Sequence, residues 1–563
     1  MLSLPGVELN MAAISDAIAA AHPDREALLY RDRRFTWADL AERTTRLANV
    51  FASAGLGVHG EFGSVPRWES VHDHVALYLH NGNEYLESML GAWKARCAPF
   101  NVNYRYVAEE LAYLLADSNA AAVVIQECFA PTLAEVLPML DRAPRLILQV
   151  SDGSGHPVSC GLLPGAIEFE QALSDASPSV GEPSPAEWSG DDIYLCYTGG
   201  TTGMPKGAMW RQEDFLIAAL GVKARDGSEY RCMDDLVAAA RGSVRALPAP
   251  PLMHGAAHWN ALSAWVAGGT VVIQDRPAHF DPADVVEAAE RHGVTSLLLV
   301  GDPMARPLVD ELRAHPRDLG SVRHVLSGGA VLSPGTKRAL QEVLPGAAIV
   351  DVLGSTESGR QGVSTTRPGA EAVSRFSPGD TAVVLDETRS RVLSPTDPDS
   401  VGQVGWLAQA GRVPLGYLGD PAKTEATFPE IAGVRYAVAG DRARWADDGT
   451  IELLGRDSVC INTGGEKVFA EEVETAAKAH PAVDDAVVCG RPSERWGEEV
   501  VAVVSFRGPE PDDEELISVM AEHIARYKLP KVIVRVPVVL RAPSGKADYR
   551  WAREMAEGGT DRR

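Results

Sequence analysis

Apolar and polar positions over 74–150 switch between the pattern of a buried strand and that of an amphipathic helix. The run HVALYL (74–79) is almost continuously apolar, and the helix pattern after it places Leu86, Met89 and Trp93 on one face. Further strand patterns follow at 121–126 and 145–150. Apolar strands that alternate with helices predict βαβ units and a parallel sheet covered on both faces.

The same rhythm returns between residues 270 and 354. A helix pattern, DPADVVEAAERHG, separates the first two of four strand patterns: TVVIQD (270–275), SLLLVG (296–301), VRHVLSGGA (322–330) and AAIVDVLG (347–354). Two doubly wound αβα units are the simplest arrangement that accounts for both segments.

The last third of the chain has a different pattern. Short apolar runs separated by Gly and Pro over 380–455 indicate a small antiparallel β unit. From 458 onward, helix and strand patterns alternate over a length typical of one domain. We therefore expect an α/β fold with a large N-terminal region over 1–455, built from the two doubly wound units and the small β unit, and a separate α+β domain over 459–563.

Composition narrows the class of protein. The chain has 563 residues, 45% of them hydrophobic, and 53 basic against 77 acidic side chains give a net charge of -24. A chain this acidic repels polyanions, so we expect no nucleic-acid partner. The seven cysteines form no CxxC pair. Free thiols and an amino terminus without the basic start of a secretory signal predict a cytoplasmic protein.

One stretch, 246–274, contains no Asp, Glu, Lys or Arg. Its length would suffice to span a bilayer, but its prolines, Gly268 and Gly269, and the polar groups of His254, His258 and Asn260 need partners that lipid does not supply. We expect no transmembrane segment here and interpret the stretch as a buried segment that faces a ligand.

The strongest chemical signal is the run YTGGTTGMPKG (197–207), which follows a strand pattern. Its glycines and threonines leave backbone N–H groups and hydroxyls free to surround a phosphate, and Lys206 adds a positive charge. It is not a Walker A loop, because Pro205 precedes the lysine and Gly207 follows it. The run predicts an anion-binding loop.

This run closely resembles the phosphate loop of the adenylate-forming superfamily, which includes acyl-CoA synthetases, luciferases and peptide-synthetase adenylation domains. Further blocks match in the family's order: PLMHG (251–255), SGGAVLSPG (327–335), LGSTE (353–357), GD (440–441), GR (455–456), GGEKVFAEEVE (464–474) and PSGKADYR (543–550). The runs MPKGAMW and PPLMHGAAHW look particularly like actinobacterial acyl-CoA synthetases for fatty acids or sterol side-chain acids.

The resemblance implies ATP, Mg²⁺ and CoA as ligands and gives roles to the matching residues. Lys546 is the expected catalytic lysine, brought to the substrate by a mobile C-terminal domain. With Glu357, Thr198 and Lys206 it makes up the catalytic set. The residues implied for ATP are Thr198, Gly199, Gly200, Thr201, Thr202, Gly203, Lys206, Gly328, Gly329, Ala330, Leu353, Gly354, Ser355, Thr356, Asp441 and Arg456.

The place of Glu357 can also be argued from the residues themselves, and Leu353 departs from the family's pattern. Glu357 follows a predicted parallel strand, where open α/β sheets place their ligands. The resemblance implies that it is the magnesium ligand, and the chemistry needs magnesium to neutralise phosphate charge. Leu353 departs from the family, which has an aromatic residue there to stack on adenine. An aliphatic side chain gives a weaker stacking surface.

The remaining implied roles concern the sugar, the acid, CoA and the domain movement. Asp441 and Arg456 resemble the ribose ligands, and Ser458, within a hinge at 456–458, resembles the pivot. His254 matches the family histidine near the acyl group, and with His258 and Trp259 it forms the expected acyl-binding set. Gly464 and Gly465 resemble the glycines that line the pantetheine path.

Together these features predict an AMP-forming acid:CoA ligase that activates a hydrophobic, medium- or long-chain or sterol-derived carboxylic acid. An acyl-AMP ligase that loads a carrier protein is an alternative. A weakly catalytic acyl or nucleotide sensor is another, which Leu353 alone would permit and an intact Lys546 and Glu357 argue against. A homodimer, the acid's identity and the pathway stay open.

Overall fold

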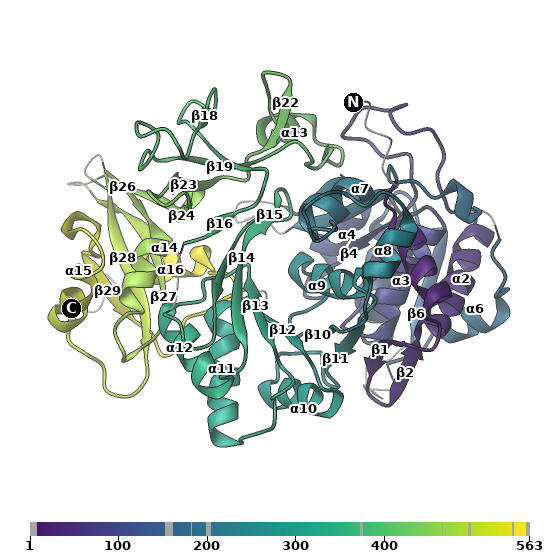
Figure 1. Ribbon diagram of the computed structural model, residues 1–563, viewed down its shortest axis with the longest axis horizontal. Coiled ribbons are helices and arrows are strands. Elements are labelled where there is room, and N and C mark those ends of the chain that lie inside the picture. Colours follow the sequence, from purple (N-terminus) through teal and green to yellow (C-terminus); the bar gives the residue numbers. More distant parts are fainter. Residues whose placement is uncertain are drawn as a thin grey trace.

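The computed structural model describes residues 8–152, 161–181, 183–198, 204–371, 375–463, 466–493, 497–542 and 545–558. Figure 1 shows the small C-terminal domain beside the large region, with the antiparallel β unit above the boundary between them. The predicted large N-terminal and small C-terminal parts are confirmed.

The first predicted unit is a five-stranded parallel sheet. Its order is β4 (Ala98–Asn101), β3 (His74–Tyr78), β5 (Ala120–Gln126), β6 (Leu146–Val150) and β7 (Ile167–Glu168). The helices in this part of the chain are α2 (Trp37–Ser53), α3 (Asn83–Lys94), α4 (Ala108–Asp117), α5 (Ala130–Val136) and α6 (Phe169–Asp175). Every residue of β3 is buried, which is why its sequence is almost continuously apolar.

The second unit is a nine-stranded mixed sheet. Its order is β16 (Ser377–Pro378), β15 (Gly359–Thr366), β14 (Ala348–Ser355), β13 (His324–Gly328), β12 (Ser296–Leu299), β10 (Arg245–Pro248), β11 (Thr270–Ile273), β1 (Glu26–Tyr30) and β2 (Arg33–Thr36). Strands β14 to β1 run parallel, and the outer strands are antiparallel. The sequence patterns did not predict that the early β1–β2 hairpin completes this sheet.

The helices of the second unit carry clear local signals. Helix α10 (Pro282–His292) begins at Asp281, whose side chain accepts from two backbone N–H groups, and ends at Gly293 with a φ of 59°. Helix α12 (Pro334–Val343) begins at the Ser333 cap. The other long helices there are α9 (Gly255–Val266) and α11 (Gly301–Ala314). Polar caps, proline in the first turn and a left-handed glycine at the end are ordinary helix boundaries.

A three-stranded sheet connects the two units to the antiparallel part. Its strands are β20 (Gly416–Tyr417), β9 (Lys206–Arg211) and β8 (Ile193–Thr198). The predicted antiparallel unit contains β18 (Val392–Leu393), β17 (Ala382–Leu385), β19 (Gly405–Ala410), β22 (Val434–Ala437), β21 (Glu430–Ile431), β23 (Asp441–Trp445) and β24 (Ile451–Arg456). Helix α13 (Pro421–Thr427) follows β20.

The C-terminal domain is a mixed sheet with three helices. Its strands are β26 (Glu466–Phe469), β25 (Cys460–Thr463), β28 (Gly497–Phe506), β27 (Val483–Ser493) and β29 (Val532–Arg535). Its helices are α14 (Ala470–Ala477), α15 (Asp513–Ala521) and α16 (Tyr549–Gly558). A buried cluster that includes Val473, Val488, Ala502 and Leu516 gives this domain its own core.

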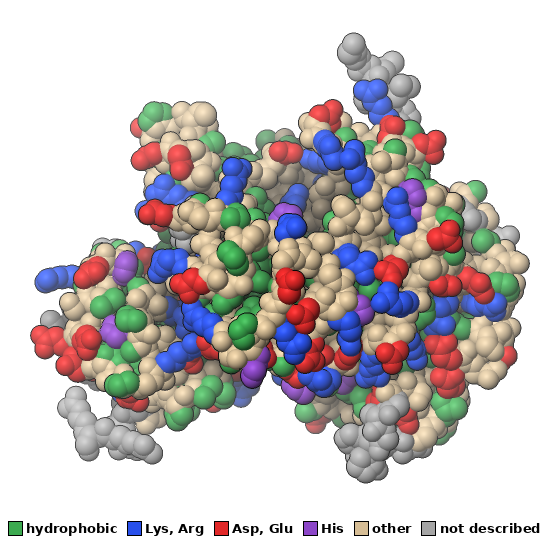
Figure 2. All heavy atoms as spheres, turned by 60° about the horizontal axis from the view of Figure 1, so that its bottom comes forward, with side chains coloured by type: hydrophobic (Ala, Val, Ile, Leu, Met, Phe, Trp, Pro, Cys, Tyr) green, Lys and Arg blue, Asp and Glu red, His purple; other side chains and the backbone are tan. Residues whose placement is uncertain are grey.

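The charge-free segment 246–274 folds as strand β10, a loop, helix α9 and strand β11. None of the helices in the described ranges is long and apolar enough to cross a membrane. Figure 2 shows acidic and basic side chains interspersed over the face that it presents. The six cysteines that the structure describes are free.

Leu353 lies in the core of the antiparallel unit. It is 7% exposed and packs with Val384, Leu407, Trp445 and Ile451. The expected aliphatic surface for adenine is therefore largely occupied by protein, so position 353 contributes to stability.

We expect Leu353→Tyr to destabilise the fold by ~1 to 3 kcal/mol, because overpacking a filled core forces side chains from their preferred rotamers. Leu353→Met, which conserves volume, is the control and should cost less than ~1.5 kcal/mol. Urea unfolding measures both variants. If Leu353→Tyr keeps wild-type stability and lowers the ATP requirement, the side chain faces the nucleotide instead.

Candidate active site

The two ends of the predicted phosphate loop lie directly opposite each other. Strand β8 ends at Thr198 and β9 begins at Lys206, and these two residues are partners in the antiparallel ladder. Lys206 forms an ion pair with Asp420, which caps helix α13. The hairpin thus brings a hydroxyl and an ammonium group together at one end of the sheet. The other expected loop residues lie outside the described residues: Gly199, Gly200, Thr201, Thr202 and Gly203.

Glu357 follows β14 in the tight connection to β15, at the carboxyl edge of the second sheet. Its Oε1 accepts hydrogen bonds from the hydroxyls of Tyr417 at 3.0 Å and Thr198 at 3.5 Å. The adjoining residue is fixed as well, because Trp210 Nε1 donates to the Thr356 carbonyl at 2.9 Å. Both hydrogen bonds go to Oε1, and they hold the Glu357 carboxylate beside the phosphate-loop hairpin.

The connection itself needs glycine and short polar side chains. A Cβ on Gly354 would collide with the Gly359 carbonyl across the β14–β15 pair. Ser355 and Ser358 hold the turn through their hydroxyls, 3.0 Å apart. The glycine and serine of the LGSTE block are therefore needed for the tight connection itself, in addition to their implied role at the nucleotide.

This carboxylate fits a magnesium ion. The described part of the chain contains no group of three or more His, Cys, Asp or Glu side chains that could hold a metal alone. Magnesium is commonly held by one or two carboxylates together with substrate phosphates and water, so a single carboxylate near a phosphate loop is an adequate donor set. The half-buried Glu357 supplies it.

Asp441 and Arg456 form a cross-strand ion pair. They are register partners on β23 and β24, and Arg456 Nε lies 3.3 Å from Asp441 Oδ1. Burial raises the pKa of Asp441, and the Asp441 charge raises the pKa of Arg456. The backbone N–H of Arg456 donates to Glu471 Oε1 of the C-terminal domain at 3.4 Å. The pair thus lies where the two domains meet.

Lys546 of the C-terminal domain faces this same cluster. Its side chain is still accessible, yet desolvation by the surrounding protein lowers its pKa. The charge of Arg456 also lowers that pKa, while Glu357 and Asp441 act in the opposite direction. The preceding Gly545 has a φ of 75° and lies close to Val300. A Cβ added to this glycine would lie 3.0 Å from Val300 Cγ1. The lysine is remote in sequence, yet the fold brings it to the carboxyl edge of the second sheet.

The three expected acyl-binding residues surround the first turns of α9. His254 precedes the helix, and burial lowers its pKa to about 4. Both ring nitrogens of His258 are hydrogen-bonded within the protein: Nδ1 to the Leu252 carbonyl at 2.7 Å and Nε2 to the Tyr194 hydroxyl. Trp259 Nε1 donates to the same hydroxyl at 2.6 Å. His258 therefore supports the wall, whereas the half-buried His254 and Trp259 remain available.

The expected adenine and hinge positions lie at the ends of strands or just beyond them. Gly328 ends β13 and is buried, Gly329 is exposed with a φ of 83°, and Ala330 is half-buried. Ser458 is exposed in a short 3₁₀ turn, Asp457–Val459, between β24 and β25. The segment after β13 and the hinge are thus accessible, as their implied roles require. The expected pantetheine residues, Gly464 and Gly465, lie outside the described residues.

Comparisons with known proteins identify the family. The model of the AMP-binding enzyme family matches residues 15–417, and that of the AMP-binding enzyme C-terminal domain matches residues 472–546. The chain belongs to the AMP-binding enzyme family. The resemblance stated from the sequence motifs is therefore confirmed.

Relatives of this AMP-binding enzyme match it over nearly the whole chain. The chain is 50% identical to medium-chain acyl-CoA ligase Mig of Mycobacterium avium, over 98% of each chain. It is 38% identical to 3-oxocholest-4-en-26-oate–CoA ligase of Rhodococcus rhodochrous, over 97% of this chain and 96% of that one. A solved structure of anthranilate CoA ligase AuaEII with anthranoyl-AMP has a TM-score of 0.79 at 20% identity and covers 99% of both chains. That likeness shows the shared fold.

Sequence reasoning missed the strand that supports the site. Strand β20 places Tyr417 on Glu357, and three residues later Asp420 pairs with Lys206. Tyr417 is 5% exposed, and burial together with the Glu357 charge raises its pKa strongly. Because 60 residues separate it from Glu357, no local periodicity could reveal this contact.

We expect Tyr417→Phe to raise the magnesium concentration needed for pyrophosphate release. The change removes one hydrogen bond to a charged group, worth ~1.5 to 3 kcal/mol, which corresponds to roughly a tenfold or larger effect. Titration of magnesium at saturating ATP measures it. Tyr436→Phe is the control, since that buried tyrosine packs with Leu385 and Trp406 instead. An unchanged requirement in Tyr417→Phe would show that Tyr417 does not position Glu357.

Proposed function

We propose that this AMP-binding enzyme is an AMP-forming acid:CoA ligase that activates a hydrophobic carboxylic acid. The observation that carries the proposal is the convergence of Glu357, Asp441, Arg456 and Lys546 beside the ends of the phosphate-loop hairpin. The full-length relatives named as acyl-CoA ligases support the same activity.

In the first step, a carboxylate oxygen of the acid attacks the α-phosphorus of ATP. A bond from that oxygen to phosphorus forms, the bond to the β-phosphate breaks, and pyrophosphate leaves with the electron pair. Both reactants are anions, so the reaction requires positive charge at the phosphates. Lys546 supplies it beside the reacting atoms, and Mg²⁺ at Glu357 would neutralise the phosphate oxygens.

The residues proposed for ATP divide by the part of the nucleotide that they would contact. Gly328, which ends β13, is assigned to adenine together with the more accessible Gly329 and Ala330 that follow it. Asp441 accepts from the ribose hydroxyls and Arg456 donates to the same sugar. The phosphates are assigned to Thr198, Gly199, Gly200, Thr201, Thr202, Gly203, Lys206, Gly354, Ser355 and Thr356. Lys206 pairs with Asp420 in this structure, and this ion pair would break when Lys206 binds the phosphates.

In the second step, the CoA thiolate attacks the acyl carbonyl of acyl-AMP, the thioester forms and AMP leaves. Lys546 is not required once the anhydride has formed. We assign the change between steps to a rotation about Ser458, because a short exposed turn can absorb a large φ/ψ change. Gly464 and Gly465 would then line the pantetheine path. The domain boundaries proposed on this basis are 1–455, the hinge 456–458 and 459–563.

The acid would bind against helix α9 and strand β8, which carries Tyr194. The rings of Trp259, Phe215 and Tyr194 lie within contact distance of one another, with centroids 5.4 Å apart for the first two and 4.2 Å for the last two. An apolar, aromatic wall favours medium-chain, long-chain or sterol-derived acids. Two of the relatives are named as a medium-chain acyl-CoA ligase and a 3-oxocholest-4-en-26-oate–CoA ligase. Use of ATP and CoA together with free thiols supports a cytoplasmic location.

Products formed from ATP, magnesium, CoA and a panel of acids test the proposal. We expect mass spectrometry to show acyl-CoA from octanoate, palmitate and a sterol side-chain acid. Four extra buried methylenes, at ~0.8 kcal/mol each, should favour octanoate over short acids by about two orders of magnitude in kcat/KM.

Omission of CoA is the control for the acceptor. Without CoA, we expect a single stoichiometric release of pyrophosphate and bound acyl-AMP. Transfer to a carrier protein with no thioester from free CoA would favour the acyl-AMP ligase alternative. Preference for acetate, or a flat chain-length profile, would contradict the apolar acid site, and absence of any acid-dependent pyrophosphate release would contradict the function.

A further inference from the structure

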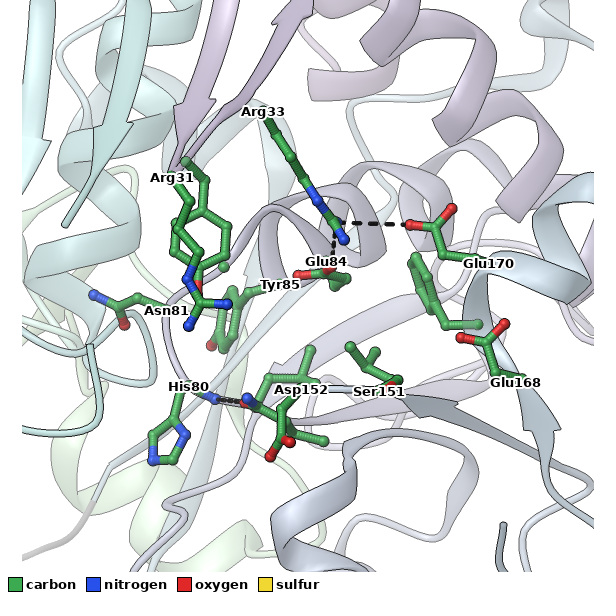
Figure 3. Close-up of a pocket in the computed structure, with 16 residues that line it drawn as sticks. Arg31, Arg33, His80, Asn81, Glu84, Tyr85, Ser151, Asp152, Glu168 and Glu170 are labelled. Carbon is green, nitrogen blue, oxygen red and sulfur yellow. Dashed lines mark hydrogen bonds and ion pairs between the residues drawn. The ribbon is translucent and has the colours of Figure 1, made fainter. Parts of the chain in front are cut away.

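A cavity of about 300 Å³ lies at the carboxyl ends of strands β3, β5 and β6 of the first sheet. The β1–β2 hairpin of the second sheet and the segment around β7 close its other sides (Figure 3). Among the described residues, none assigned above to ATP, acid or CoA lines it. Open α/β sheets bind ligands at this edge, and the volume suits a small molecule.

The hairpin side of the cavity carries an arginine whose terminal nitrogens are not engaged by acidic groups. Arg31 Nε donates to the Asp275 carbonyl at 3.2 Å, and its guanidinium lies 4.9 Å from the Tyr30 ring. Across the described ranges, Arg31 forms no ion pair with an acidic side chain. Figure 3 shows its guanidinium between Asn81 and Tyr85, directed into the cavity.

The backbone at Arg31 is also unusual. Its φ of 54° is in the left-handed region, which costs a residue other than glycine ~1 to 2 kcal/mol. The hairpin explains it, because Tyr30 pairs with Arg33 across a two-residue loop and such loops favour a positive φ at their first residue. The conformation at the tip of the hairpin turns this side chain toward the cavity.

The neighbouring Arg33 is already neutralised. It lies 2.9 Å from Glu84 and 3.8 Å from Glu170, and Glu170 in turn pairs with Arg43 at 2.8 Å. Arg33, Glu84 and Glu170 lie together at the upper rim in Figure 3 and stabilise one another. Arg31 is therefore the positive group that the cavity offers to a ligand.

The opposite wall is negative. Asp152 and Glu168 stand there with the Ser151 hydroxyl, after β6 and at the end of β7 (Figure 3). Glu168 uses one oxygen to cap α6, accepting from Gln171 N at 2.7 Å, and its second oxygen takes no part in that cap. His80 adds no positive charge at neutral pH, because burial lowers its pKa to about 4.

The two amide side chains of the lining, Asn81 and Gln126, form hydrogen bonds to protein backbone. Asn81 donates to the Pro250 carbonyl at 3.0 Å and accepts from Leu252 N at 2.6 Å, and Gln126 accepts from His80 N at 2.9 Å. Selectivity would therefore come from the two charged walls.

We propose that this cavity binds a small zwitterion of the α-amino acid class, with its carboxylate on Arg31 and its ammonium group on Asp152 and Glu168. Opposite charges on opposite walls complement a dipolar molecule. A phosphate ester would bring several negative charges against Asp152 and Glu168, so the same lining disfavours nucleotides. The site is separate from the adenylation machinery.

Calorimetry on the full chain without ATP or CoA tests this proposal, with each common L-α-amino acid as probe at millimolar concentration. We expect saturable binding of at least one of them. The matched probes lack one charge each; for L-glutamine they are glutaramate, without the ammonium group, and γ-aminobutyramide, without the carboxylate. Both should bind at least ~10-fold more weakly, since each loses a charge-assisted contact.

Variants on the two walls locate the site. Arg31→Gln and, independently, Asp152→Asn should each weaken binding by ~10-fold or more. Arg34→Gln is the control, because this arginine on the same hairpin pairs with Glu26 outside the cavity. No saturable binding of any amino acid, equal binding of the single-charge probes, or equal binding by wild type and both wall variants would overturn the proposal. Because no activity is measured, these outcomes are independent of the ligase function.

Discussion

The hydrogen bonds to a single carboxylate, Glu357, join the parts of the candidate site. Glu357 ends the β14 connection, Thr198 comes from the phosphate-loop hairpin, and Tyr417 comes from β20. These three elements belong to different segments of the chain, and their side chains meet at one anchored oxygen. A carboxylate held this way keeps its position without filling its whole coordination capacity, which is the condition for acting as a metal ligand.

The cationic groups around that carboxylate depend on a second constraint, the docking of the small domain. In the described ranges, Lys546 has no acidic partner within ion-pair distance, although Glu357 and Asp441 attract it. Desolvation and Arg456 disfavour its charge, so an anionic substrate between these groups would stabilise the ammonium form. The charged form of Lys546 and an anionic phosphate therefore stabilise each other at this position.

The sequence predicted the elements that repeat locally. Continuous apolar strands such as 74–79 and the helix patterns between them led to two doubly wound units, and the end of the 347–354 strand correctly located Glu357 at the carboxyl edge. Motif order identified the family. The β1–β2 hairpin was not predicted to join the second sheet, because its pairing with β11 depends on residues more than two hundred positions away.

The individual contacts of the site were less predictable, for the same reason. Tyr417 and Asp420 sit in a segment without distinctive periodicity, yet they position the carboxylate and the lysine that the motifs indicated. Leu353 was expected to offer a surface to adenine, and the sequence did not predict that it also packs into the core of the antiparallel unit. His258 shared the charge-free segment with His254 but has both ring nitrogens engaged by protein.

The two half-reactions of Lys546→Ala test most directly whether Lys546 serves adenylation and not thioester formation. Pyrophosphate release from acid and ATP should fall by a few hundredfold, since losing one preorganised charge donor costs ~3 to 4 kcal/mol. Thioester formation from supplied acyl-AMP and CoA should keep its wild-type rate. Lys531→Ala, at an exposed lysine of the same domain, should leave both rates unchanged. Equal loss of both half-reactions in Lys546→Ala would contradict this role of the lysine.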